Sequence, residues 1–155
     1  MSKDIILIEK KFLSREECCK LIEFYNQNIN ESFKYRDTFP INTNKFQNIT
    51  EKIENVCYNL NALCQLDTHQ IVKWPKGSKM GPHFDPKDDV FACLVYLNDD
   101  YLGGETCFKR KFFFDRKVKP EVGKLVIFSN SKILHWVNEV KNGTRYTLAL
   151  WFVSK

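Results

Sequence analysis

The sequence lacks any long hydrophobic run. The apolar stretch Ile5–Ile8 near its start is far shorter than the ~20 consecutive apolar residues that span a bilayer. This stretch also lacks the length and the small-residue cleavage site of a secretory signal peptide. We therefore expect neither a signal peptide nor a membrane partner.

Cysteine is present, but its spacing does not indicate disulfide bonds or a metal-binding pair. None of the six cysteines belongs to a Cys-x-x-Cys motif, and Cys18 and Cys19 are adjacent. In a chain without a secretory signal, this pattern favours free and mostly buried thiols over a disulfide framework. The expected location is therefore a reducing compartment, namely the cytoplasm.

A strong excess of charge is also missing. The net charge is +5 and the sequence pI is about 8.8, which makes nucleic acid an unlikely partner. The small basic excess fits a solvated surface, and it leaves open an acidic small molecule or partner. The apolar content of 43% and the thirteen Phe exclude a disordered chain. A length of 155 residues suits one compact domain.

The first part of the chain has helical periodicity. Ser14, followed three residues later by Glu17, predicts a capping box, and apolar residues follow at helical spacing until about Asn28. The polar stretch 31–42 is expected to be a loop. A second apolar stripe predicts a helix over about 43–60.

After residue 65 the apolar period changes from 3.6 to 2, which predicts strands. Two helices followed by seven or eight short strands indicate a mainly β fold, with a jelly roll covered by helices. We expect a single domain over 1–155, with 1–65 as helical support and 66–155 as the core. The expected strands cover 70–74, 90–97, 106–108, 112–118, 124–128, 133–137 and 146–153.

Histidine is scarce, and two of the three histidines stand in informative places. His83 and Asp85 are two residues apart, so on a strand they would share one face. His135 lies in an apolar stretch, where an imidazole requires a hydrogen bond or a metal. Two imidazoles and one carboxylate form the facial ligand set of non-haem Fe(II). The remaining histidine, His69, is assigned a structural role.

Arg145 opens the last expected strand and shares a face with Thr147, Ala149 and Trp151. An inward-facing guanidinium requires a carboxylate partner, because it cannot lose its charge. A ligand carboxylate would satisfy it. An ion pair with Glu105 or another acid of a neighbouring strand is the structural alternative.

Together these residues and their neighbours make the stretch from about 70 to 152 resemble the 2-oxoglutarate- and Fe(II)-dependent dioxygenases, in their prolyl 4-hydroxylase-like branch. The similarity extends to Phe12–Cys18, before and within the first helix. The matching motifs, in order, are His83-x-Asp85, Leu94–Asn98, Gly103–Phe108, Pro120–Phe128, His135, and Gly143–Arg145 with Trp151.

This resemblance implies a double-stranded β-helix (jelly roll) and a set of cofactors. Fe(II) would be bound by His83, Asp85 and His135, with 2-oxoglutarate as cosubstrate, O2 as oxidant and ascorbate as an optional reductant. Arg145 would pair with the distal carboxylate of 2-oxoglutarate, and Tyr96 would hydrogen-bond the same end. Thr106 and Trp151 would line the pocket. These residues, with Arg145 counted among the catalytic ones, form the candidate site.

The substrate implied by the branch is a prolyl residue in a protein or peptide. A free amino acid or another small molecule is the alternative substrate, and a non-catalytic jelly-roll binding module is the alternative class. Nucleic-acid demethylases commonly carry a second Arg where this chain has Trp151, which argues against them. The oligomeric state is not predicted.

Two features depart from the branch or remain open. Trp74 stands where relatives often have Tyr, nine residues before His83, so an aromatic wall is kept and a phenol is lost. The basic and aromatic segment 109–119 is explained equally well as the border of a substrate groove or as a plain hairpin.

Overall fold

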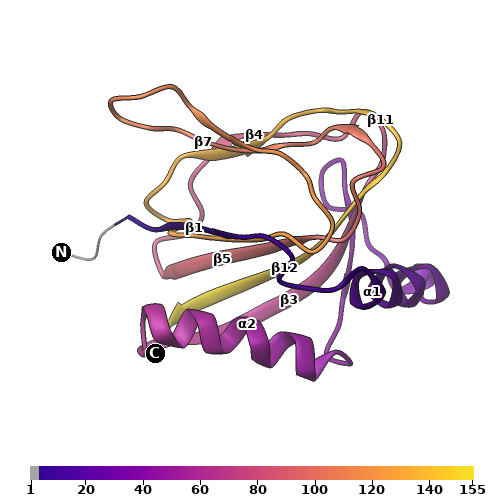
Figure 1. The fold of residues 1–155 in the computed structure, drawn as a ribbon, viewed down its shortest axis with the longest axis horizontal. Helices are drawn as coiled ribbons and strands as arrows, with labels where there is room; N and C mark the ends of the chain where they lie inside the picture. Colours follow the sequence, from indigo (N-terminus) through magenta and orange to yellow (C-terminus); the bar gives the residue numbers. More distant parts are fainter. Residues whose placement is uncertain (1–3) are drawn as a thin grey trace.

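The computed structural model describes residues 4–155 and consists of two facing antiparallel sheets, with two helices covering one of them (Figure 1). Met1–Lys3, at which a signal peptide would begin, lie outside the described residues. The helical elements are α1 (Arg15–Gln27), the short 3-10 helix Ile29–Glu31, and α2 (Gln47–Leu60). The strands are β1 (Ile6–Glu9), β2 (Phe39–Asn42), β3 (Cys64–Trp74), β4 (Met80–His83), β5 (Asp89–Tyr96), β6 (Leu102–Gly103), β7 (Thr106–Phe108), β8 (Arg116–Val118), β9 (Leu125–Phe128), β10 (His135–Val137), β11 (Val140–Asn142) and β12 (Arg145–Ser154).

The larger sheet, here called the major sheet, has the strand order β1-β9-β5-β12-β3-β2. The minor sheet has the order β4-β10-β7-β8, and β11 pairs with β6 as a separate ribbon. Most neighbours in these orders, β2-β3 and β7-β8 excepted, are not consecutive strands of the sequence, as a jelly roll requires. The predicted fold class is therefore confirmed.

Helix α1 begins where the sequence predicts. The Ser14 hydroxyl accepts a hydrogen bond from the Glu17 backbone N–H at 3.0 Å, and the Glu17 carboxylate accepts one from the Ser14 N–H at 2.8 Å. These two bonds satisfy amide groups that the first turn of a helix leaves free. The buried face of α1, which contains Cys18, Leu21 and Tyr25, packs on the major sheet.

The segment before α2 differs from the expectation in two ways. Phe39–Asn42 is not loop but an edge strand that pairs with β3. The helix starts at Gln47 rather than at Thr43, because the Thr43 N–H extends the sheet by donating to the His69 carbonyl at 3.3 Å. The backbone at Thr43 thus continues alongside β3, and the helix begins only after this contact ends.

The expected strand over 112–118 is also wrong in its first half. Only Arg116–Val118 pairs with β7, which is itself three residues long. Phe112, Phe113 and Phe114 therefore have no partner strand, and their side chains are exposed.

Two apolar regions lie on opposite faces of the major sheet. The face toward α1 and α2 carries the largest cluster, which includes Leu148, Leu150 and Phe152 of β12. The face toward the minor sheet carries smaller clusters, and residues of alternate parity on β12, such as Arg145 and Thr147, are buried there. The alternation of β12 therefore separates a structural core from the space between the sheets.

All six cysteines are free, and five of them are buried, as the sequence indicates. Within residues 4–155, no helix is long and apolar enough to cross a membrane.

We expect Gly123→Ala to destabilise the fold by about 2–4 kcal/mol, because Gly123 has a φ of 78° and an added Cβ would lie 2.0 Å from the Leu13 carbonyl oxygen. Gly77→Ala is the matched control. Gly77 also has a positive φ, of 89°, but an added Cβ would meet nothing within 4 Å. Urea unfolding of both variants tests the prediction, which is wrong if the two lose the same stability.

Candidate metal and cosubstrate site

The three residues predicted to bind metal converge at one end of the minor sheet. His83 ends β4 and is paired with His135, the first residue of β10. The His83 Nε2 lies 3.3 Å from the Asp85 Oδ1, and the His135 Nε2 lies 3.7 Å from the same oxygen. One ligand atom from each residue lies within 4.8 Å of the other two. This is a compact set of two imidazoles and one carboxylate.

Asp85 reaches this set in a way that strand geometry does not predict. β4 ends at His83, so Asp85 is not on the same strand face as the sequence argument assumed. Its backbone N–H instead donates to the Asn130 carbonyl at 3.1 Å. The turn after β4 is thus tied to the end of β9, and this contact brings Asp85 beside the two histidines.

Both histidines are oriented by a backbone carbonyl. The Nδ1 of His83 lies 2.8 Å from the Gly81 oxygen, and the Nδ1 of His135 lies 2.8 Å from the Ile133 oxygen. A carbonyl can only accept, so each Nδ1 carries the proton and each Nε2 presents its lone pair to the shared space. This arrangement of protons suits metal binding.

Asn130 is a site residue that the sequence analysis missed. Its side chain is fully buried, and its Nδ2 donates to the Asp85 Oδ2 at 2.7 Å and to the Asp89 Oδ2 at 3.1 Å. One oxygen of Asp85 is thereby held, and Oδ1 remains directed at the histidines. The only sequence signal is a polar Ser-Asn-Ser directly after an apolar strand, which is common in turns.

The environment of His135 favours the neutral imidazole. His135 is 6% exposed, and its ring packs edge-on against Phe128 at a centroid distance of 4.7 Å. Burial lowers the pKa of His135, while the Ile133 carbonyl and Asp85 act in the opposite direction. Because a histidine must be neutral to bind a metal ion, this shift of the pKa suits a ligand.

Arg145 is the largest fully buried side chain, with 1% of its surface exposed. Its Nη2 donates to the Thr106 hydroxyl at 3.3 Å, while Nε and Nη1 have no partner among the described residues. Glu105, the alternative partner, accepts instead from Asn138 at 3.1 Å. A buried guanidinium without a carboxylate is costly, so this site is complementary to an acidic ligand.

A hydrogen-bonded pair next to Arg145 links the two sheets. The Tyr96 hydroxyl, from β5, lies 2.8 Å from the Thr106 hydroxyl of β7 and accepts from the Thr106 backbone N–H at 3.1 Å. The Arg145 guanidinium also lies 5.4 Å from the centre of the Tyr96 ring. Thr106 is two residues, roughly 7 Å along the strand, from Phe108, which pairs with His135. The predicted cosubstrate residue Thr106 thus lies on the same short strand as the residue that pairs with the metal ligand His135.

Aromatic side chains enclose Arg145. The guanidinium lies 4.5 Å from the centre of the Trp74 ring, and Trp151 packs against the clusters on this face of the sheet. Tyr101 was not predicted. It is 9% exposed, its hydroxyl has no partner among residues 4–155, and its pKa is raised by burial and lowered in part by Arg145. The Tyr101 hydroxyl and the Arg145 guanidinium thus both have hydrogen-bonding capacity that a polar ligand would satisfy.

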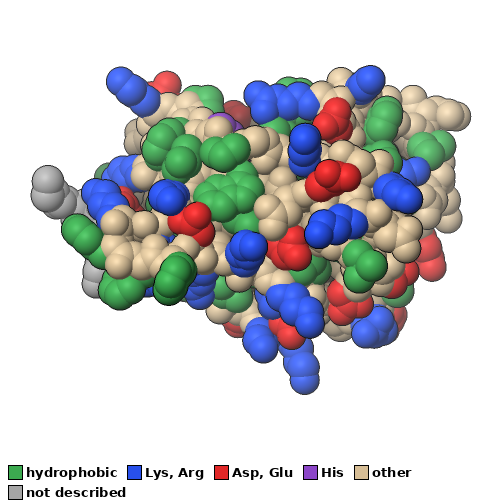
Figure 2. All heavy atoms as spheres, turned by 90° about the horizontal axis from the view of Figure 1, so that it is seen from above, with side chains coloured by type: hydrophobic (Ala, Val, Ile, Leu, Met, Phe, Trp, Pro, Cys, Tyr) green, Lys and Arg blue, Asp and Glu red, His purple; other side chains and the backbone are tan. Residues whose placement is uncertain are grey.

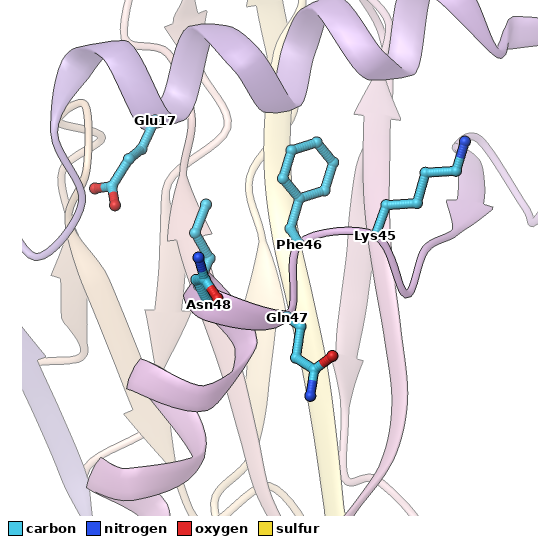
Figure 3. A pocket seen from close by; sticks show the side chains of 6 residues that line it. Glu17, Lys45, Phe46, Gln47 and Asn48 are labelled. Atoms are coloured by element: carbon cyan, nitrogen blue, oxygen red, sulfur yellow. The ribbon is translucent and has the colours of Figure 1, made fainter.

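A hollow on the surface lies elsewhere. It measures about 280 Å³ and is lined by Glu17, Lys45 and the start of α2 (Figure 3). Its charged groups are already used, since Glu17 pairs with Lys52 at 2.7 Å and Lys45 lies over the Phe24 ring. This hollow is on the helical side of the major sheet, away from the histidines, and it contains no set of metal ligands.

Comparison with known proteins points to the same chemistry. The sequence profile of the 2OG-Fe(II) oxygenase superfamily matches residues 69–153. Rat prolyl 3-hydroxylase 2 is 34% identical over an alignment of 95 positions, and the alignment covers 57% of this chain. The match spans only 12% of the length of that relative.

Solved structures share the fold. A prolyl-4-hydroxylase from Pseudomonas putida superposes with a TM-score of 0.80 at 17% identity, covering 97% of this chain and 92% of that one. A Trichoplax adhaerens prolyl hydroxylase, solved in complex with a peptide fragment of the hypoxia inducible factor oxygen degradation domain, gives 0.77 at 15% identity. It covers 96% of this chain and 83% of that one. At such identities these likenesses establish the architecture alone.

Proposed function

Because the chain belongs to the 2OG-Fe(II) oxygenase superfamily, a family of dioxygenases that use Fe(II), 2-oxoglutarate and O2, we propose that it hydroxylates a prolyl C–H bond in a polypeptide. The observation that carries this proposal is the convergence of His83, Asp85 and His135 beside a buried, unpaired Arg145. A set of metal ligands and a binding site for an anion are what this chemistry requires.

We propose that His83, Asp85 and His135 hold Fe(II). The donor set fits this ion, because two neutral imidazoles and one carboxylate occupy one side of a metal and leave other positions open. When bound, Fe(II) with 2-oxoglutarate supplies the oxidising chemistry, in which O2 is consumed and succinate and CO2 are formed. The Asn130 amide keeps Asp85 in place during these events.

We propose that Arg145 binds the distal carboxylate of 2-oxoglutarate through the two nitrogen atoms that lack partners. Thr106 orients the guanidinium through its hydroxyl, and Tyr96 fixes Thr106. The Trp74 and Trp151 rings exclude water from this end of the space, which strengthens the ion pair. The protein thus contributes position, charge and shielding.

The polypeptide substrate is supported by the relatives, which are named as prolyl hydroxylases, and by the neighbour solved with a peptide. A free amino acid is the second candidate. Mass spectrometry of proline-containing peptides and of free proline, incubated with the protein, Fe(II) and 2-oxoglutarate, separates the two. A one-oxygen gain on a peptide supports the proposal, and a gain on free proline alone contradicts it.

We also propose that residues 1–155 act as a single domain in the cytoplasm, with ascorbate as an optional reductant. The support is that β1 and β2 from the first part of the chain pair with β9 and β3 of the core. The six free thiols agree with a reducing compartment.

We expect Tyr101→Phe to weaken 2-oxoglutarate binding roughly 10- to 100-fold, because the lost hydroxyl would donate to a charged carboxylate. The same change should leave the ligand-free protein equally or more stable, because it removes an unpaired buried hydroxyl. Calorimetric titration of 2-oxoglutarate into the Mn(II)-loaded protein measures the first effect, and thermal unfolding measures the second. Tyr146→Phe, on the helix-facing side of β12, is the matched control. Equal affinities for both variants would remove Tyr101 from the site.

A further inference from the structure

The segment 109–119, here called the basic loop, carries the entire net charge of the chain. It contains six Lys or Arg residues and a single acid, Asp115. Of the 24 basic and 19 acidic residues in the whole sequence, the remaining 18 and 18 balance. The net charge of +5 is therefore a local property of one loop rather than of the surface.

The basic loop also presents three consecutive aromatic side chains to solvent. Phe112, Phe113 and Phe114 are 88%, 69% and 98% exposed. The Lys109–Asp115 ion pair, at 3.2 Å, closes the base of the loop, and the Arg110 guanidinium lies 4.8 Å from the centre of the Phe113 ring. Exposed apolar side chains gathered in this way are typical of an interaction surface. Five cations of the loop form no ion pair with any described residue: Arg110, Lys111, Arg116, Lys117 and Lys119.

The basic loop is continuous with the candidate metal site. Phe108, which precedes the loop, is paired with His135, and the Lys109 N–H donates to the Leu134 carbonyl at 2.9 Å. The loop projects beyond the label of β7 in Figure 1, away from the body of the molecule. Phe84, which is 56% exposed, adjoins His83. From the side of the minor sheet, part of a histidine is visible beside hydrophobic side chains, with charged side chains nearby (Figure 2).

We propose that the basic loop is a docking surface for the substrate polypeptide, and that the docked segment is acidic and carries apolar residues. This inference rests on the proposed function, since it takes the substrate to be a polypeptide. The unpaired cations attract Asp and Glu side chains, while the exposed rings pack on apolar side chains. An extended peptide advances about 3.3 Å per residue. Phe114 is six positions from Phe108, so the loop reaches substrate side chains no more than about six positions from the reacting one.

Two labelled peptides with one central proline test this inference. One has Glu and Leu within about six residues of the proline, and the other has Gln in place of each Glu. We expect the Glu peptide to bind the Mn(II)- and 2-oxoglutarate-loaded protein about 10-fold more tightly at low salt, as measured by fluorescence anisotropy. Equal binding of the two peptides overturns the proposal.

Substitutions in the basic loop test whether its side chains cause the preference for the Glu peptide. The triple variant Lys111→Gln, Arg116→Gln, Lys117→Gln should bind both peptides equally. The control triple Lys34→Gln, Lys76→Gln, Lys141→Gln, with the same loss of charge at exposed sites elsewhere, should keep the preference. Phe112→Ser, Phe113→Ser, Phe114→Ser should weaken binding of both peptides, whereas Leu63→Ser, at a residue 68% exposed, should not. If a control variant loses binding or preference to the same extent as the matching loop variant, the basic loop is not the docking surface.

Activity separates failure of this inference from failure of the proposed function. If the Glu peptide is hydroxylated, and the charge variant lowers kcat/KM for this peptide but leaves kcat unchanged, the docking surface and the proposed function are both supported. If the peptide is hydroxylated equally well by the charge variant, the docking surface is wrong and the function stands. If charge-dependent binding occurs and no peptide is hydroxylated, the loop binds a polypeptide that is not a substrate, which overturns the inference. Binding to phosphatidylserine vesicles without any peptide preference would assign the loop to a membrane surface instead.

Discussion

Replacing His135 with alanine is expected to lower 2-oxoglutarate turnover by at least about 100-fold. Loss of a residue that only supports a ligand typically costs 10- to 100-fold in metal affinity or activity, and His135 presents its Nε2 directly to the shared space. With two ligands left, the metal would be bound weakly and in the wrong geometry. Succinate formation, followed in the presence of Fe(II), measures the loss.

His69→Ala is the matched control for this prediction. His69 lies on β3, away from the other two histidines, and is paired with Leu150 of β12. We expect this variant to retain turnover. Calorimetric titration with Mn(II) gives a second measurement, because His135→Ala should lose affinity for the ion even where no reaction is followed. If His135→Ala turns over 2-oxoglutarate at the rate of His69→Ala, the proposed metal site is wrong. If neither variant nor the wild-type protein turns over 2-oxoglutarate, the non-catalytic binding role gains support.

Replacing Arg145 with leucine is expected to raise the Kd for 2-oxoglutarate by at least about 100-fold. Removing one partner of a buried ion pair costs about 3–5 kcal/mol, and this energy corresponds to a factor of 100 or more. The ligand-free protein should show the opposite tendency. Two guanidinium nitrogens have no partner among the described residues, so leucine removes an uncompensated buried charge and should leave stability unchanged or higher.

Thermal unfolding with and without 2-oxoglutarate, in the presence of Mn(II), measures both effects of Arg145→Leu at once. The wild-type protein gains stability from the ligand, and the variant should not. Arg145→Lys keeps the charge but loses the forked geometry, so an intermediate affinity is expected. Arg15→Leu, at an exposed position of α1, is the control. A large loss of stability in ligand-free Arg145→Leu would indicate that the guanidinium has a structural partner rather than a ligand.

Local sequence patterns predicted the elements that are stabilised locally. The capping box of Ser14 and Glu17 acts within one turn, so the start of α1 is visible in the sequence. The strand 106–108 was likewise predicted with its observed bounds. The patterns failed where a distant partner decides the structure, as for Phe39–Asn42, which is a strand because it pairs with β3. Phe112–Phe114 are the reverse case, because β7 is too short to pair with them.

The same distinction between local and distant contacts applies to the candidate site. The sequence by itself determined a prediction of the ligand types and of an acidic cosubstrate, because residue chemistry and motif order do not depend on coordinates. The residues that it predicted for these roles are His83, Asp85, His135 and Arg145. Only the tertiary structure decided how they meet. Asp85 is placed by the Asn130 carbonyl and amide from the end of β9, and Tyr101 is buried next to Arg145 from a loop. Such contacts join residues that are 44 or 45 positions apart, and no periodicity within a segment can encode them, since they depend on which strands the jelly roll places side by side.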